Sequence, residues 1–176
     1  MNINIIKDDL FTADKECVLA HCISSDFALG AGIAKVFRDK LGTKEELERK
    51  YTGEWDGNGY CAFTNEAEWL VANLITKERS FHKPVYKALQ QALEDFKRQL
   101  IVFSSVSKPR KIAMPLIGCG LDGLEWKNVR DIIGKVFGDT KYEISVYVLT
   151  DSEYSRVCEI EKEHHLLDVR SGKYVC

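Results

Sequence analysis

The stretch MPLIGCGLDGLEW, residues 114–126, carries most of the information about how this chain folds. It begins inside the apolar run KIAMPLI (111–117), which predicts a buried β-strand, and it ends where apolar spacing predicts a helix over 126–137. Between them lies GCGLDG (118–123), which holds three glycines. Backbone amides in such a loop can form an anion-binding concavity, although a tight turn into the helix would use the same residues.

A second glycine segment lies nearer the N-terminus. The run CVLAHCI (17–23) predicts another buried strand, and Gly30-Ala31-Gly32 precedes helical spacing from residue 33 to 41, where Gly42 ends it. Glycines and a helix N-terminus together suit a phosphate group. The segment is neither a P-loop nor a G-x-G-x-x-G loop, because no G-K-[ST] follows and Lys35 replaces the third glycine. Taken alone, it fits a turn packed on a helix equally well.

The remaining periodicity predicts further strands at residues 2–6, 60–64, 68–76 and 144–150, and a long amphipathic helix at 85–103. Thr43 is expected to cap a short second helix, with Glu46 as its capping-box partner. Asn65-Glu66 is predicted as a hairpin turn, and Pro109 marks a loop.

The order of these elements, ββααββαβαβ, predicts an α/β fold: a mixed, mostly parallel β-sheet flanked by helices on both faces in three α/β/α layers. Ligands bind outside the carboxyl ends of strands in such sheets. Both glycine segments follow strands, so we expect them to converge on one cleft. Residues 1–150 are predicted to form this domain, and residues 151–176 a C-terminal extension, with a short helix and a tail, that packs on it or trails from it.

Composition narrows the class of protein. The 176 residues are 45% apolar, which is ample for one core, and the net charge of -2 gives no general basic excess for nucleic acid, although a local patch stays open. No apolar run reaches the roughly 20 residues of a membrane span, and MNINIIKDDL lacks the pattern of a signal peptide. We therefore expect a cytoplasmic protein (nuclear in a eukaryote) that does not bind membranes. We also expect a monomer, although nothing in the composition determines the oligomeric state.

The cysteines predict neither disulfides nor metal. None of the six forms a C-x-x-C pair, and a large, core-rich chain favours free thiols: Cys17, Cys22, Cys61, Cys119, Cys158 and Cys176. Cys158 lies near His164 and His165, but this spacing fits no standard zinc pattern. We expect no metal and no cofactor.

Four segments occur in order: AHCIS (20–24), GAGIAKVFRDKLG (30–42), LITKERSFHKP (74–84) and MPLIGCGLDGLEW (114–126). Together they resemble the macrodomain family, and within it the branch that contains terminal ADP-ribose protein glycohydrolase and its bacterial relatives. The resemblance covers residues 2–150 and leaves residues 151–176 outside. It implies an ADP-ribose-binding site between the two glycine loops.

The resemblance also implies a role for each binding residue. Asp9, followed by Leu10, matches the acidic residue that accepts a hydrogen bond from the adenine amino group, although a solvated turn residue is the alternative. His21 and Ser24 match the segment on the nucleoside side of the cleft, and His21 equally fits a core histidine. The phosphate-binding loops correspond to Gly30, Ala31, Gly32 and Ile33, and to Ile117, Gly118, Cys119, Gly120 and Leu121, the second loop also embracing the distal ribose. Cys119 is expected to offer its backbone amide rather than a catalytic thiol.

Two further residues match the catalytic pair of the glycohydrolase branch. Lys77 matches the lysine that attacks C1″ of the distal ribose, and Asp122 matches its acid/base partner. A ribose can open to an aldehyde equivalent that forms a Schiff base with lysine, while the carboxylate moves the proton. Without the resemblance, Lys77 would pass for a solvated lysine beside Glu78 and Arg79. Other branches carry an asparagine in the first segment and lack this lysine, whereas this chain has Ser24-Ser25-Asp26 (24–26).

The resemblance thus implies a hydrolase that removes ADP-ribose from modified protein or nucleic acid. A reader that binds ADP-ribose without turnover and a phosphatase for ADP-ribose 1″-phosphate are the alternatives, because one fold hosts several activities. The Lys77–Asp122 pair favours the hydrolase.

Overall fold

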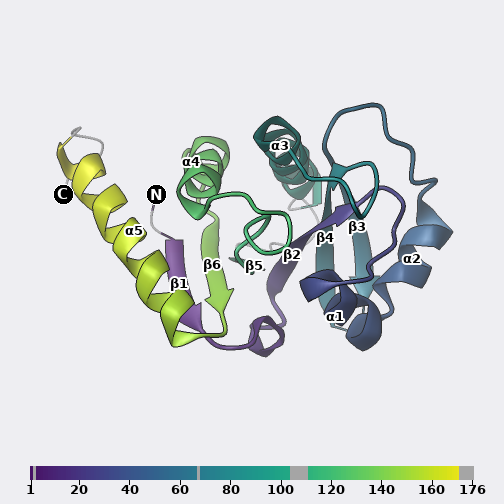
Figure 1. Ribbon diagram of the computed structural model, residues 1–176, viewed down its shortest axis with the longest axis horizontal. Coiled ribbons are helices and arrows are strands. Elements are labelled where there is room, and N and C mark those ends of the chain that lie inside the picture. The colour runs from purple at the N-terminus through teal and green to yellow at the C-terminus, as the bar shows by residue number, and fades with distance from the viewer. Residues whose placement is uncertain (2, 67, 104–110, 171–176) are drawn as a thin grey trace.

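A six-stranded sheet forms the middle layer of the protein (Figure 1), in the strand order β1-β6-β5-β2-β4-β3. The computed structural model describes residues 1, 3–66, 68–103 and 111–170. The strands are β1 (Ile3–Lys7), β2 (Cys17–Ser24), β3 (Tyr60–Glu66), β4 (Trp69–Lys77), β5 (Lys111–Met114) and β6 (Glu143–Val148). β3 runs antiparallel to β4, and the other neighbouring strands pair in parallel.

Helices cover both faces of this sheet. They are α1 (Gly32–Leu41), α2 (Thr43–Lys50), α3 (Tyr86–Phe103), α4 (Trp126–Phe137) and α5 (Asp151–Arg170), with a single 3₁₀ turn, η1 (Leu10–Thr12), after β1. Figure 1 shows α3 and α4 on one side of the sheet and α1 and α2 on the other, with α5 beside β1 at the edge. Phe96 and Phe137 fill the core on the α3/α4 side, and Phe37 and Leu47 fill it on the α1/α2 side. The predicted three-layer α/β fold is confirmed.

The central strands explain why the sequence shows continuous apolar runs. β2 is buried on both faces over nearly its whole length, as parallel strands between two helical layers are. It pairs with β4 from Val18 opposite Leu70 to Ile23 opposite Ile75, and a β-bulge then brings Ser24 opposite Lys77. The bulge therefore lies at the carboxyl ends of these strands, where a site is expected.

α5 is longer than the short helix that the sequence predicts. It packs against β1, and its Val157 is fully buried in the core on the α3/α4 side. Arg130 of α4 ties the two helices together, with Nε 3.2 Å from Glu161 Oε2 in a mostly buried ion pair. Val157 and Ile160 are the main apolar residues of α5 that pack on this core, so the helix has only a weak apolar stripe. The weak stripe explains why the sequence predicts a shorter helix. Residues 171–176 lie outside the described residues, and in the described part no helix is long and apolar enough to span a membrane.

Two local predictions around α2 are wrong, for one shared reason. β3 continues through Asn65 and Glu66, which pair with Leu70 and Trp69, so these residues are not the hairpin turn. Thr43 does not form a capping box, because its buried hydroxyl lies 2.6 Å from Glu66 Oε2. This contact joins the start of α2 to the end of β3.

The other half of the predicted capping box is also engaged elsewhere. Glu46 pairs with Arg49 at 2.7 Å and Lys50 at 2.6 Å, and the N-cap of α2 is Gly42. The strand expected at 111–117 ends earlier, at Met114, because Pro115 has no amide hydrogen for the ladder. The loop expected at Pro109 lies outside the described residues.

Candidate active site

One cleft of about 730 Å³ lies where the five parallel strands end, a volume that suits a small-molecule ligand. Its lining comes from the carboxyl ends of β1, β2, β4, β5 and β6, from the loop into α1, and from the first turns of α5. The lining residues are 8–10, 22–24, 29–34, 36, 77, 80–83, 115–122, 147–149, 153 and 156. All of the residues that the sequence predicts for the site line this cleft except His21.

The second glycine loop is held in a fixed shape by its own backbone. Gly118 has φ 70°, and a Cβ there would lie 2.8 Å from Leu124 Cδ1, so this position requires glycine. Leu124 N donates to Gly118 O at 2.9 Å and Cys119 N donates to Leu116 O at 3.0 Å. At Gly120, by contrast, a Cβ would meet nothing within 4 Å, so the cleft is open directly over this residue. The loop thus presents bare backbone to a ligand.

The first glycine loop faces the second across the cleft. Ala31 is the N-cap of α1 and makes no side-chain capping bond, so the first amides of the helix lack a capping side chain, and residues 31–34 line the cleft. A Cβ on Gly32 would lie 3.5 Å from Leu121 Cδ1, which shows how near the two loops come. Phe27 and Leu29, just before the loop, adopt φ values of 49° and 42° although they are not glycines. Strained backbone of this kind is concentrated at functional sites.

Lys77 and Asp122 meet at one end of the cleft. Lys77 is the last residue of β4, Asp122 belongs to the second glycine loop, and Nζ lies 2.5 Å from Oδ1. Their side chains are 12% and 14% exposed, so most of this ion pair is out of water. Lys83 Nζ donates to Leu121 O from the loop after β4 and thereby ties the two segments together. The structure brings together the two residues that the sequence predicts as a catalytic pair.

Asp9 lies at the other end of the cleft, after β1. Its Oδ1 accepts a hydrogen bond from Phe11 N at 3.0 Å and caps η1, and its Oδ2 lies 3.5 Å from Lys40 Nζ. The carboxylate is about half exposed (47%), so it retains acceptor capacity for a ligand. Leu10 beside it is buried and offers an apolar surface. A carboxylate next to an apolar wall can bind a planar base that carries an amino group.

His21 does not line the cleft, which corrects its predicted place there. The ring is fully buried, stacks on Phe37 with centroids 3.8 Å apart, and lies 2.7 Å from Asn73 Oδ1 through Nε2. Side chains alternate along a strand, so the adjacent Cys22 faces the cleft while His21 faces α1. Ser24, two residues on, does line the cleft, and its hydroxyl donates to Asp26 Oδ1 at 2.5 Å.

The thiols in the cleft are not nucleophiles. Burial raises the pKa of Cys119 to about 12, and burial also raises the pKa of Cys22 far above its usual value. Both thiols therefore stay protonated at neutral pH and resemble small apolar side chains. The five cysteines of the described residues are free, in line with the expected thiols.

Several residues of the cleft were missed in the sequence. Residues 80–83 follow β4 and residues 147–149 end β6, and the rule that ligands bind at the carboxyl ends of parallel strands would have found both segments. Phe81 is 78% exposed and Leu149 is 72% exposed, so each offers apolar surface at the rim. Glu153 and Arg156 come from α5, in a part of the sequence with no pattern that points to the cleft.

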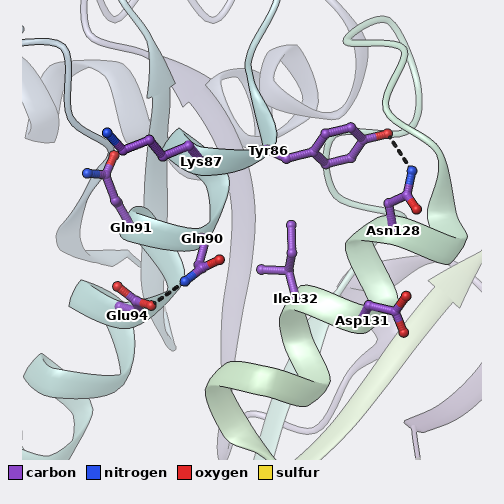
Figure 2. Close-up of a pocket in the computed structure, with 8 residues that line it drawn as sticks. All are labelled: Tyr86, Lys87, Gln90, Gln91, Glu94, Asn128, Asp131 and Ile132. Carbon is purple, nitrogen blue, oxygen red and sulfur yellow. Dashed lines mark hydrogen bonds between the residues drawn. The ribbon is translucent and has the colours of Figure 1, made fainter.

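A second depression lies between α3 and α4 (Figure 2) and has a volume of about 660 Å³. Its lining is Tyr86, Lys87, Gln90, Gln91, Glu94, Asn128, Asp131 and Ile132. The polar groups there bond to one another: Asn128 Nδ2 donates to Tyr86 Oη at 3.1 Å, and Gln90 Nε2 donates to Glu94 Oε1 at 2.7 Å. This groove contains only helix side chains, and the strand ends and glycine loops belong to the other cleft.

Known proteins resemble this chain in sequence or in fold. No protein-family model matches the chain. It is 41% identical over 149 residues to the human ADP-ribose glycohydrolase OARD1, a match that covers 84% of this chain and 91% of the relative. Among solved structures, the macrodomain of Mycobacterium tuberculosis DarG has a TM-score of 0.66 at 20% identity, covering 85% of this chain and 99% of its own. Thermosipho africanus DarTG in complex with ADP-ribose has a TM-score of 0.64 at 18% identity, covering 86% of this chain and 42% of its own.

These two structures show the same fold, and the human relative shows the family. The chain belongs to the macrodomain family, in the branch that contains terminal ADP-ribose protein glycohydrolase.

Proposed function

We propose that this protein binds ADP-ribose in the cleft and hydrolyses its bond to a modified macromolecule, with Lys77 as nucleophile and Asp122 as acid/base. The assignment as an ADP-ribose hydrolase follows from its membership in a branch whose human member is an ADP-ribose glycohydrolase. The observation that carries the mechanism is the Lys77–Asp122 contact of 2.5 Å at one end of the cleft. An amine and a carboxylate at this separation can exchange one proton.

The proposed ligand matches the cleft from end to end. Adenine lies against Leu10 with its amino group toward Asp9, and the diphosphate lies between the two glycine loops. Exposed amides and the N-terminus of α1 complement its negative charge. The distal ribose then reaches Lys77 and Asp122. A Cβ at Gly120 would meet nothing within 4 Å, so the diphosphate has room to approach the backbone there.

The proposed reaction consumes one water. Asp122 takes a proton from the Lys77 ammonium, and the amine lone pair attacks C1″ while the bond from C1″ to the macromolecule breaks. The bonding electrons leave on the macromolecule, which takes the proton from Asp122. Asp122 then carries a second proton from the Lys77 nitrogen to the ring oxygen, so that the ribose ring opens and a protonated Schiff base forms at Lys77. Water then adds to C1″ with Asp122 accepting its proton. The ring closes as the bond from Lys77 to C1″ breaks, and the leaving nitrogen takes the protons of Asp122 and of the ring hydroxyl, which restores the ammonium and the carboxylate. The products are free ADP-ribose, the unmodified macromolecule and the original amine.

The burial of the pair favours an enzyme over a reader. Withdrawing an ammonium and a carboxylate from water has a desolvation cost that apolar residues of the same size would avoid. Stability therefore does not explain the Lys77–Asp122 pair, whereas a proton-transfer role does. The Asp9 end and the glycine loops alone would be enough for a protein that only binds.

We also propose that the macromolecule is a protein or a nucleic acid carrying ADP-ribose. One chain supplies both glycine loops and the Lys77–Asp122 pair, so a monomer contains the entire proposed site. We expect it to act in the cytoplasm, or in the nucleus of a eukaryote.

The experiment is a substrate panel followed by mass spectrometry. The protein is incubated with ADP-ribosylated protein, ADP-ribosylated DNA and ADP-ribose 1″-phosphate in separate reactions. We expect free ADP-ribose from at least one of the first two. Turnover of the 1″-phosphate alone would identify a phosphatase, and binding of ADP-ribose without any turnover would identify a reader.

A further inference from the structure

The three Lys and Arg side chains that line the cleft differ in their partners. Lys77 pairs with Asp122, and Lys83 donates to the carbonyl oxygen of Leu121. Arg156 of α5 also lines the cleft, but it has no hydrogen-bond or ion-pair partner among the described residues. An unpaired guanidinium beside loops that present backbone amides lacks the anion for which its five N–H groups are suited.

The backbone of Arg156 is held firmly near the start of α5. Thr150 and Glu153 form a reciprocal cap, in which Glu153 N donates to Thr150 Oγ1 at 3.2 Å and Thr150 Oγ1 donates to Glu153 Oε2 at 3.1 Å. The next residue after Arg156, Val157, is fully buried in the core. Arg156 is therefore held between a capped helix start and a core anchor, while its own side chain is exposed to the cleft.

Two acidic residues that line the same cleft as Arg156 already have other partners. Glu153, one turn before it, is engaged with Thr150, and Asp122 is engaged with Lys77. The charge of Arg156 does reach the second glycine loop: burial raises the pKa of the Cys119 thiol, and the guanidinium acts against that rise. Arg156 and the loop that we assign to the diphosphate, residues 117–121, line the same cleft.

We propose that Arg156 binds the diphosphate of the ligand, so that α5 completes a phosphate site otherwise made of backbone amides. The proposal rests on the proposed function, because it takes ADP-ribose as the ligand. Guanidinium groups bind phosphate oxygens through two parallel N–H bonds, which are stronger than bonds from neutral amides. α5 lies beyond the four segments on which the family resemblance rests, so this contact is a property of the present chain rather than of those segments.

Calorimetry and stopped-flow binding with ADP-ribose and with adenosine test this proposal. The variants are Arg156→Gln, Arg156→Lys and a control, Lys162→Gln, which removes one positive charge from an exposed position of α5 outside the cleft. We expect Arg156→Gln to weaken ADP-ribose binding about tenfold, roughly 1.4 kcal/mol, mainly through faster dissociation. The ADP-ribose affinity of Arg156→Lys should lie between those of wild type and Arg156→Gln, since lysine keeps the positive charge but loses the paired N–H donors. Adenosine binding and the control should change less than about twofold.

The outcomes separate this proposal from the proposed function. Wild-type affinity in Arg156→Gln would overturn the proposal for Arg156 and leave the hydrolase untouched. An equal loss of ADP-ribose affinity in Arg156→Gln and Lys162→Gln, caused only by slower association, would also overturn the proposal. Such a result would show that Arg156 attracts the ligand over a distance and does not contact it. If the wild type binds no ADP-ribose at all, the proposed function fails, and the assignment of Arg156 fails with it.

Discussion

Two polar pairs each include a residue of β4, Asn73 or Lys77, but differ in almost every physical respect. His21 and Asn73 lie opposite each other in the middle of the sheet and are fully buried. Lys77 ends β4 four residues later and meets Asp122 at 2.5 Å, with both side chains retaining some exposure to the cleft. The first pair contacts only other protein groups, whereas the second faces the space where a ligand binds. A polar residue within a parallel strand therefore contributes to stability, and one at its carboxyl end is available for chemistry.

The buried pair has a defined protonation state. Asn73 Nδ2 donates to Ala62 O at 3.0 Å and to Thr64 Oγ1 at 2.9 Å, so its Oδ1 accepts the hydrogen on His21 Nε2. His21 Nδ1 is buried without a partner among the described residues, so an added proton would have no acceptor. Burial accordingly lowers the pKa of His21 to about 4, with the bond to Asn73 acting in the opposite direction.

The largest effect is expected at the cleft pair. Lys77→Ala should lower turnover by a factor on the order of 10³, about 4 kcal/mol, because it removes the nucleophile. ADP-ribose affinity should change less than about tenfold. Lys77→Arg should fail similarly, since a guanidinium stays protonated. Lys111→Ala, which removes an exposed lysine at the start of β5, is the control and should turn over normally.

The phosphate site gives the next largest effect. Gly120→Glu should weaken ADP-ribose binding by more than about 100-fold, roughly 2.7 kcal/mol, because it places a carboxylate where the diphosphate lies. The fold should persist, since a Cβ at this position meets nothing within 4 Å. Gly120→Gln separates bulk from charge and should bind better than Gly120→Glu. Wild-type affinity in both variants, with unchanged circular dichroism, would exclude this loop from the diphosphate site.

The buried pair should respond to pH rather than to ligand. Because the folded-state pKa of His21 is about 4 and lies below its unfolded value of about 6.5, the unfolded chain takes up the proton first. The stability linked to His21 is complete above pH 6.5 and is lost as the pH falls toward 4, by about 3 kcal/mol. Urea unfolding of wild type and His21→Gln at several pH values measures this, because acids elsewhere affect both proteins equally. The two stability curves should converge as the pH falls, and parallel curves would show that His21 is not the linked group.

The smallest effect is expected at the adenine end. Asp9→Asn keeps an oxygen for Phe11 N but loses the carboxylate, and should weaken ADP-ribose binding about fivefold, roughly 1 kcal/mol. The half-exposed position of Asp9 limits the size of this loss. The hypoxanthine analogue of ADP-ribose, which lacks the amino group, should bind wild type more weakly than ADP-ribose does. Its affinities for wild type and for Asp9→Asn should be nearly equal. Equal wild-type affinity for both bases would remove Asp9 from adenine recognition.

The fold could be predicted from the sequence because its pattern is local. The apolar run of β2, the helical spacing after Gly32 and the glycines after β5 each follow from a few neighbouring residues. The sequence-based predictions were wrong where a residue far away in the sequence determines the local structure. Thr43 lost its expected capping role to Glu66, 23 residues away, and Glu66 was held in β3 by the same contact.

The site shows the same division. The glycine loops could be predicted as phosphate sites, with a tight turn as the alternative, from a few neighbouring residues. Lys77 looks like any solvated lysine, and only the resemblance of its segment, residues 74–84, to the glycohydrolase branch distinguished it. His21 was assigned to the cleft from its segment, whereas the alternation of side chains along β2 would have turned it toward α1. Arg156 lies on a helix with a weak apolar stripe, and no pattern around it indicates that it reaches the cleft.

The most direct test of the account is the covalent mass of Asp122→Ala after incubation with an ADP-ribosylated substrate and borohydride. Lys77 remains in this variant and can lose its proton to water, so a slow attack still forms the Schiff base. Hydrolysis of the Schiff base lacks the carboxylate that activates water, so the Schiff base persists and borohydride reduces it in place. We predict an ADP-ribose adduct on the peptide that contains Lys77, and none in the double variant with Lys77→Ala. The account is contradicted if no adduct forms while Lys77→Ala alone releases ADP-ribose at the wild-type rate.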